Sequence, residues 1–170
     1  MKNFETPLAI TMGDPSGIGP EIILKSVVET KLNNFLIFGD SLVFDSLIKS
    51  LGLPLTINKI SELSEAIFEE DYINLFETSK LNHLPHYGKI SKECGKVSFD
   101  AIIKSIELAK QGKVSGIVTA PISKKALNLA RINYPGHTEI LAGYSNNKAV
   151  SMMLLNKHLK TVLVTLHCSM

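Results

Sequence analysis

The feature that most constrains the fold is a series of short, almost entirely apolar runs, separated by segments with helical periodicity. The runs cover residues 8–12, 35–40, 116–121, 149–155 and 161–166. Strands that read as continuous apolar runs are typical of a sheet covered by helices on both faces, because a half-exposed strand alternates apolar and polar residues. The chain is therefore predicted to be an α/β protein with βαβ units around a mostly parallel sheet.

Helix start and stop signals lie between these runs. Pro20 suits the first turn of a helix, and Ser41 is a candidate N-cap for a helix that Gly52 ends. A long helix is predicted from about residue 93 to 111, and a shorter one after Ser123. The segment 54–92 is less regular and contains two strand-like stretches and an exposed loop.

Composition excludes several classes of function. The 170 residues carry a formal net charge of +2, with the lysines scattered, so nucleic acid and anionic membranes are not expected as partners. No apolar run approaches the roughly 20 residues that span a bilayer, and the N-terminus lacks the features of a signal peptide. A cytoplasmic location is expected.

The stretch "GDPSGIGPE" (13–21) follows the first apolar run. Its glycine spacing is neither that of the dinucleotide fingerprint nor that of a P-loop, which ends in Gly-Lys-Ser/Thr. A glycine-rich turn between a strand and a helix lets the backbone approach a ligand closely, and Asp14 adds a carboxylate at the edge of the sheet where open α/β folds bind ligands. A ligand-binding loop and a purely structural turn both remain open.

One histidine stands in a favourable context. In "YPGHTEILA" (134–142), Thr138 is a candidate N-cap of the helix that follows. His137 is then expected to project from the loop before this helix, where it can donate to an anionic or hydroxylated ligand. The alternative is a capping loop with an incidental histidine.

The other histidines differ in context. His167 follows the apolar run 161–166, and at a strand end an imidazole can bind a divalent metal, although one histidine does not make a site. His83, His86 and His158 are interpreted as loop or turn residues.

Five strings occur in a characteristic order: "ITMGDPSGIGPEI", "GIVTAPISKKAL", "YPGHTEILA", "VSMMLL" and "VLVTLH". Together they resemble the 4-hydroxythreonine-4-phosphate dehydrogenase family of vitamin B6 biosynthesis over residues 8–167. The first string is also similar to a stretch of isocitrate and isopropylmalate dehydrogenases, whose fold this family shares. The resemblance therefore implies an isocitrate/isopropylmalate dehydrogenase-like fold.

The resemblance also implies a homodimeric oxidoreductase that uses NAD or NADP and a divalent metal such as zinc, magnesium, manganese or cobalt. Its substrate is 4-phosphohydroxythreonine, a small phosphorylated hydroxy amino acid. Oxidation of the C3 hydroxyl is followed by loss of carbon dioxide, which gives 3-amino-2-oxopropyl phosphate for pyridoxal 5'-phosphate biosynthesis. A divalent cation on the substrate hydroxyl favours the alkoxide that expels hydride.

The resemblance assigns residues as well. His137 and Thr138 match the substrate-contacting His-Thr pair, and His167 matches the first of three metal-binding histidines. Asp14, Gly17, Gly19 and Lys124 match residues that line the same cleft, and no chemical role is assigned to them. The general base is left unassigned.

The sequence departs from the family pattern after His167. The family's other metal histidines, its phosphate-binding basic residues and most of its NAD contacts lie further downstream, whereas this sequence ends at Met170 with "CSM" after the histidine. Residues 1–170 are therefore expected to be the N-terminal portion of a two-domain dehydrogenase, apparently incomplete at the C-terminus.

Three alternatives stay open. The first is a sister dehydrogenase that acts on a four-carbon sugar-acid phosphate, threonate or erythronate 4-phosphate. The second is a truncated, non-catalytic relative that acts in binding or assembly. The third is an acyl-phosphate transferase of the same fold, against which the His-Thr-Glu string argues.

Overall fold

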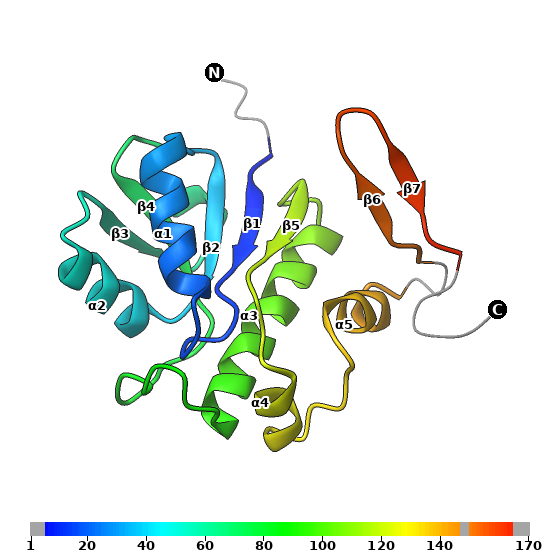
Figure 1. Ribbon diagram of the computed structural model, residues 1–170. Coiled ribbons are helices and arrows are strands. Elements are labelled where there is room, and N and C mark those ends of the chain that lie inside the picture. The colour runs from blue at the N-terminus through cyan, green and yellow to red at the C-terminus, as the bar shows by residue number, and fades with distance from the viewer. Residues whose placement is uncertain (1–5, 147–149, 165–170) are drawn as a thin grey trace.

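A five-stranded parallel sheet forms the centre of the protein (Figure 1). The structure is a computed structural model, and it describes residues 6–146 and 150–164. The strand order is β3-β4-β2-β1-β5, with bounds Thr56–Ile60, Tyr72–Glu77, Phe35–Gly39, Leu8–Thr11 and Gly116–Thr119. All four strand pairings within this sheet are parallel. The α/β prediction is confirmed.

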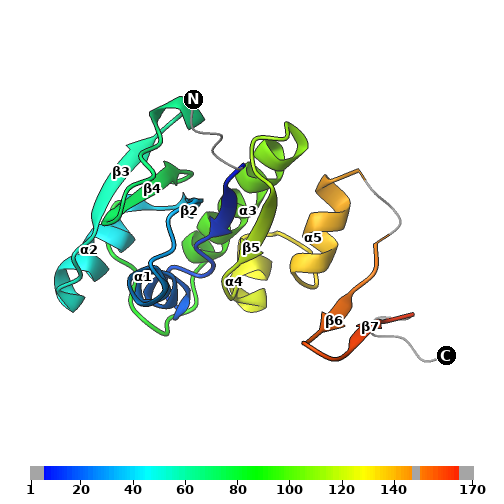
Figure 2. The ribbon, with the colours of Figure 1, turned by 90° about the horizontal axis from the view of Figure 1, so that it is seen from above.

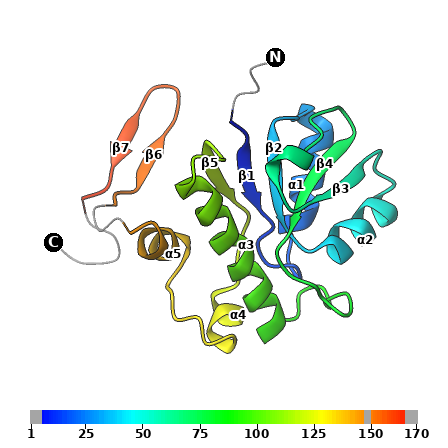
Figure 3. The same ribbon diagram turned by 180° about the vertical axis from the view of Figure 1, so that it is seen from behind.

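Helices cover both faces of the sheet. Helices α1 (Gly19–Thr30) and α2 (Ser41–Leu51) lie on one face, and α3 (Lys92–Lys110) crosses the other (Figures 1 and 3). The short α4 (Lys124–Leu129) packs against α3, and α5 (His137–Tyr144) follows it. The long helix and the helix after Ser123 are therefore found within a residue or two of their predicted bounds.

The alternation of side chains along β2 explains why its sequence is apolar throughout. Phe35 and Ile37 belong to the core cluster on the α1 and α2 side, whereas Leu36 and Phe38 belong to the cluster under α3. Phe38 stacks on Phe76 of β4 with ring centroids 5.2 Å apart. Because all four β2 side chains are almost completely buried, the strand has no face that could tolerate polar residues.

The cap of α2 differs from the prediction. Asp40, not Ser41, is the N-cap, and its Oδ1 accepts a hydrogen bond from the Leu42 backbone N–H at 3.0 Å. The Ser41 hydroxyl instead hydrogen-bonds to the carboxylate of Glu77 at the end of β4. Gly52 ends the helix in a left-handed conformation, φ 61°, as predicted.

Asp40 has a second structural role, and its replacement is expected to be costly. Its Oδ2 accepts from the Leu81 N–H at 2.7 Å and from the Ser79 hydroxyl at 3.2 Å, and the residue is 1% exposed. Asp40→Ala therefore removes a helix cap and leaves a partly buried loop N–H unpaired, which costs about 2 kcal/mol. Urea unfolding of the variant measures this loss. Asp45→Ala, on the exposed side of α2, is the control and should change stability by less than about 0.5 kcal/mol.

The last two apolar runs do not join the central sheet. They form β6 (Met153–Leu155) and β7 (Lys160–Val162), an antiparallel hairpin that lies apart from the sheet, beyond α5 (Figures 1 and 2). Every residue of both strands is exposed, and Leu155 is 68% exposed. The expectation of two further buried strands is therefore wrong for the described residues, because within them no helix layer covers this hairpin. A helix with the length and apolarity needed to cross a bilayer does not occur in the described part of the chain.

Candidate functional site

Three loops meet at the carboxyl edge of the sheet. The loop between β1 and α1 contains the glycine-rich stretch, and its Asp14 N–H donates to the Pro121 carbonyl of the β5–α4 loop at 2.8 Å. The loop between β4 and α3 joins them, because the Gly88 N–H donates to the Ser16 carbonyl at 2.8 Å. The strand order reverses at β1, which pairs with β2 on one side and with β5 on the other, and open α/β folds bind ligands at the carboxyl edge of such a reversal.

Two of the three glycines in the stretch 13–21 are required by packing within the protein. Gly13 has φ +74°, and a side chain there would overlap the Pro121 carbonyl and lie 2.9 Å from the Ala120 carbonyl carbon. A side chain at Gly19 would overlap the Met12 carbonyl. Gly17 is exposed, with ordinary contacts to Asp14 at 3.4 Å and beyond. The close contacts of Gly13 and Gly19 therefore favour the structural-turn interpretation for these two positions.

Asp14 is used inside its own loop. Its Oδ1 accepts hydrogen bonds from the Ser16 backbone N–H at 2.9 Å and from the Ser16 hydroxyl at 2.8 Å. The residue is 8% exposed. This local turn fixes the path of the loop into α1, and it accounts for the aspartate without a ligand.

His137 lies next to the β5–α4 loop. It is the first residue of α5, whose N-cap position is Gly136 with no side-chain cap. The expectations that Thr138 caps this helix and that His137 precedes it are therefore both wrong. The helix begins earlier than predicted because Gly136 supplies the extended residue before it. His137 remains at the helix start, as the sequence predicts.

The imidazole of His137 is poised for interaction with a ligand. Its Nε2 is buried and has no hydrogen-bond partner. Burial lowers the pKa of this histidine below 6.5, and a hydrogen bond with the Ala120 backbone opposes the shift. The ring is therefore neutral at pH 7, with one nitrogen available to donate to or accept from a bound molecule.

The lowered pKa of His137 predicts a pH dependence of stability. Well above pH 6.5 the ring is neutral in both the folded and the unfolded chain, and its contribution to stability is constant. As the pH falls below 6.5 the unfolded chain takes up the proton first, so the free energy of unfolding decreases until the folded-state pKa is passed. Urea unfolding between pH 7.5 and 5 should show a decrease that is smaller in His137→Gln. An NMR titration midpoint of His137 at or above 6.5 would contradict this assignment.

Thr138 faces a different space from His137. It lines a cavity of about 520 Å³ between α3, β5, α5 and residues 150–152, together with Ile117 and Leu141. Most of the lining is apolar, so the Thr138 hydroxyl is one of few polar groups there. Thr138 follows His137 directly in the sequence, but that both residues contact one ligand stays a prediction.

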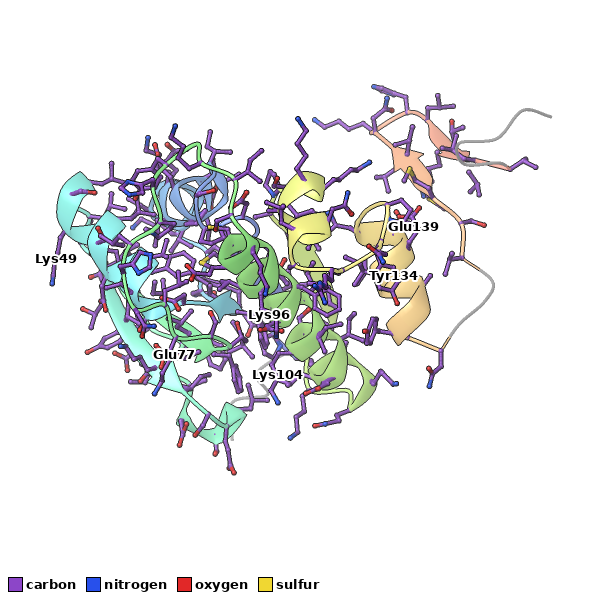
Figure 4. All side chains as sticks on the ribbon, turned by 90° about the horizontal axis from the view of Figure 1, so that it is seen from below. Lys49, Glu77, Lys96, Lys104, Tyr134 and Glu139 are labelled. Carbon is purple, nitrogen blue, oxygen red and sulfur yellow. The ribbon has the colours of Figure 1, made fainter. Side chains whose placement is uncertain are left out.

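Two charged side chains approach Gly136, the residue before His137. Lys124 and Glu139 project from the first turns of α4 and α5, and Figure 4 labels Glu139. A Cβ atom on Gly136 would lie 3.5 Å from Glu139 Oε2 and 3.9 Å from Lys124 Cε. Glu139 was not predicted as a site residue. The one feature of the sequence that could have pointed to it is its position in "GHTE", two residues after His137. The structure thus brings Lys124, His137 and Glu139 together around one glycine.

A metal site does not emerge from these side chains. Within residues 6–146 and 150–164, no group of three or more His, Cys, Asp or Glu residues could hold a metal ion. His167, the predicted metal ligand, lies outside the described residues. Its assignment as a metal ligand therefore stays a prediction.

The protein family described as "Pyridoxal phosphate biosynthetic protein PdxA" matches residues 31–170. The chain belongs to the PdxA family. It is 47% identical to a 4-hydroxythreonine-4-phosphate dehydrogenase of Beijerinckia indica, over 100% of this chain and 51% of the relative. It is 34% identical to a "Putative D-threonate 4-phosphate dehydrogenase" of Fusobacterium nucleatum, over 98% of this chain and 52% of the relative.

A solved structure shows the same fold. The crystal structure of 4-hydroxythreonine-4-phosphate dehydrogenase from Klebsiella pneumoniae superimposes with a TM-score of 0.90 at 33% identity, over 99% of this chain and 52% of that one. The PdxA resemblance drawn from the sequence motifs is confirmed. The chain spans about half the length of the curated relatives it matches.

Proposed function

We propose that this chain is the N-terminal portion of a two-domain, homodimeric PdxA dehydrogenase of the cytoplasm. The proposed reaction oxidises 4-phosphohydroxythreonine at its C3 hydroxyl, and the product then loses carbon dioxide to give 3-amino-2-oxopropyl phosphate. The observation that carries the proposal is the neutral imidazole of His137, whose buried Nε2 lacks a partner at the carboxyl edge of the sheet. The 47% identity to a 4-hydroxythreonine-4-phosphate dehydrogenase supports this substrate.

The residues of this chain have a defined share in the proposed reaction. NAD or NADP, when bound, would supply the hydride acceptor, and a divalent cation would supply the positive charge that favours the alkoxide form of the substrate hydroxyl. His137 Nε2 hydrogen-bonds to a substrate oxygen and so fixes its orientation. Since the ring is neutral at pH 7, it holds that oxygen without a fixed charge of its own. We propose Thr138 as a second substrate contact and His167 as a metal ligand, as the family resemblance implies.

A second candidate substrate is threonate 4-phosphate. Relatives at 34% and 37% identity carry the name of a D-threonate 4-phosphate dehydrogenase, and both substrates share a hydroxyl and a phosphate. The two differ at C2, which carries an amino group in 4-phosphohydroxythreonine and a hydroxyl in threonate 4-phosphate.

The test compares the two substrates directly. The protein is produced as its own gene encodes it, and NAD reduction is followed with 4-phosphohydroxythreonine and with D-threonate 4-phosphate, each with Zn²⁺, Mg²⁺, Mn²⁺ or Co²⁺. We expect kcat/KM to be higher for 4-phosphohydroxythreonine by at least tenfold. A preference for threonate 4-phosphate would support the second candidate, and no reduction with either would refute both.

A further inference from the structure

Three side chains at or next to Gly136 have polar groups without hydrogen-bond partners among the described residues. The Lys124 ammonium and the Glu139 carboxylate make no hydrogen bond or ion pair with any described residue, and His137 Nε2 is likewise unpaired. Other neighbouring charged side chains on the surface form ion pairs with each other, such as Lys25 with Glu21 at 2.6 Å and Lys104 with Glu107 at 3.0 Å. Lys124 and Glu139 lie close together without forming such a pair. Among the described residues, a cation and a carboxylate beside Gly136 and the imidazole of the next residue are therefore without partners.

We propose that Lys124 binds an anionic group of the substrate beside His137, and that Glu139 is a positioning residue for Lys124. The proposal rests on the proposed function and adds a residue to the same site. A charge-assisted hydrogen bond from a lysine ammonium to a phosphate or carboxylate oxygen is about twice as strong as a neutral one. His137 supplies a directional contact to the same molecule, but no charge at pH 7.

The local fold holds Lys124 in place for this role. It is the first residue of α4, and the Ser123 hydroxyl caps that helix by accepting from the Ala126 N–H at 3.2 Å. The preceding Ala120 and Pro121 are tied to His137 and to the Asp14 loop. The backbone that carries Lys124 is therefore fixed against both neighbouring parts of the site.

Glu139 sets the direction of the lysine side chain. Its Oε2 and Lys124 Cε both lie within contact distance of the same point over Gly136. The carboxylate attracts the ammonium toward Gly136, and because the two groups do not form an ion pair, the ammonium protons stay available to a ligand. Because both groups are partly solvated, this attraction is modest, and its loss should matter less than loss of the lysine itself.

The test uses steady-state kinetics of the protein as its gene encodes it, with Lys125→Ala as the matched control. Lys125 is the adjacent exposed lysine of α4, and nothing places it near Gly136. We expect Lys124→Ala to raise KM for 4-phosphohydroxythreonine by on the order of tenfold to a hundredfold. Lys124→Arg should show a smaller increase in KM, because it keeps the positive charge. The KM of Lys125→Ala should stay within about twofold of the wild-type value. Glu139→Gln should raise KM by about threefold to tenfold with kcat changed less. Equal effects of Lys124→Ala and Lys125→Ala would overturn the proposal.

Two competitors identify the anion. Inorganic phosphate and D-threonate, which lacks the phosphate, are titrated as inhibitors of the wild type and of Lys124→Ala. The competitor whose inhibition constant rises at least fivefold in the variant marks the group that Lys124 binds. If neither constant changes, Lys124 does not bind an anion and the proposal fails.

A binding measurement separates this proposal from the proposed function. The His137 ring resonances of the protein as its gene encodes it are followed by NMR during titration with inorganic phosphate and D-threonate. If no NAD reduction is found, the dehydrogenase proposal fails, while weaker binding of either anion in Lys124→Ala than in Lys125→Ala still supports the lysine assignment. No saturable shift with either anion, or equal affinities in the two variants, would refute it.

Discussion

Replacing His137 with alanine is expected to lower turnover with 4-phosphohydroxythreonine by about two to four orders of magnitude. The imidazole is held at the carboxyl edge of the sheet by the Ala120 backbone, and its Nε2 has no protein partner. Loss of one positioned hydrogen-bond donor at a reacting oxygen typically costs a factor of about 10² to 10³, and loss of a proton-transfer group costs up to about 10⁴. The measurement is the rate of NAD reduction at saturating substrate.

The folding of this variant should change little, because the ring is only half-buried and one of its nitrogens is unpaired. His158→Ala is the matched control, since that ring belongs to the exposed turn of the β6–β7 hairpin, where the His158 N–H donates to Asn156 Oδ1 at 2.8 Å. Turnover in His137→Ala within a few-fold of the wild type would remove His137 from the substrate site. A large loss of thermal stability would instead make it a structural residue.

Gly95→Ala is expected to destabilise the protein by about 3 kcal/mol. Gly95 lies in α3 where the backbone of α4 crosses it. An added Cβ would overlap the carbonyl group of Ala126 and lie 2.8 Å from the Leu127 nitrogen. Backbone atoms cannot move aside as a flexible side chain would, so the two helices must separate, and overpacking of this kind costs about 1–3 kcal/mol or more. Urea unfolding followed by circular dichroism measures the change.

The same substitution at another helical glycine provides the control. A Cβ on Gly143 in α5 would meet only the Tyr134 ring, at 3.4 Å, which is ordinary contact. Alanine is the better helix former by about 1 kcal/mol, so Gly143→Ala should be neutral or slightly stabilising. If Gly95→Ala is equally well tolerated, α3 and α4 are not in close contact. Because α4 carries Lys124, Gly95→Ala should also weaken substrate binding.

The sequence predicted secondary structure best where burial on both faces of the sheet requires apolar residues throughout the strand. The apolar run around Phe35–Gly39 predicted a central strand, and it is one, because its side chains fill the cores on both faces. Gly52 predicted a helix end. The residue that ends a helix often takes a left-handed backbone conformation, which glycine adopts most easily, and this preference is local to the chain.

The same signals failed where two adjacent residues offered similar chemistry. Ser41 and Asp40 are both good N-caps, and the structure selects Asp40 because its second oxygen also binds the loop at Ser79 and Leu81. The apolar residues of β6 predicted a buried strand, but burial depends on what packs against the strand, and within the described residues nothing covers it.

The sequence by itself determined the fold class, the PdxA family and the position of His137 at a helix start. These follow from local periodicity, from glycine sterics and from the order of motifs, which are properties of short segments. Only the tertiary structure decided that Gly13 and Gly19 serve packing between loops and that Asp14 holds its own turn. Only it brought Lys124 and Glu139 to Gly136, because α4 and α5 both pack against α3, and no local sequence pattern encodes that packing.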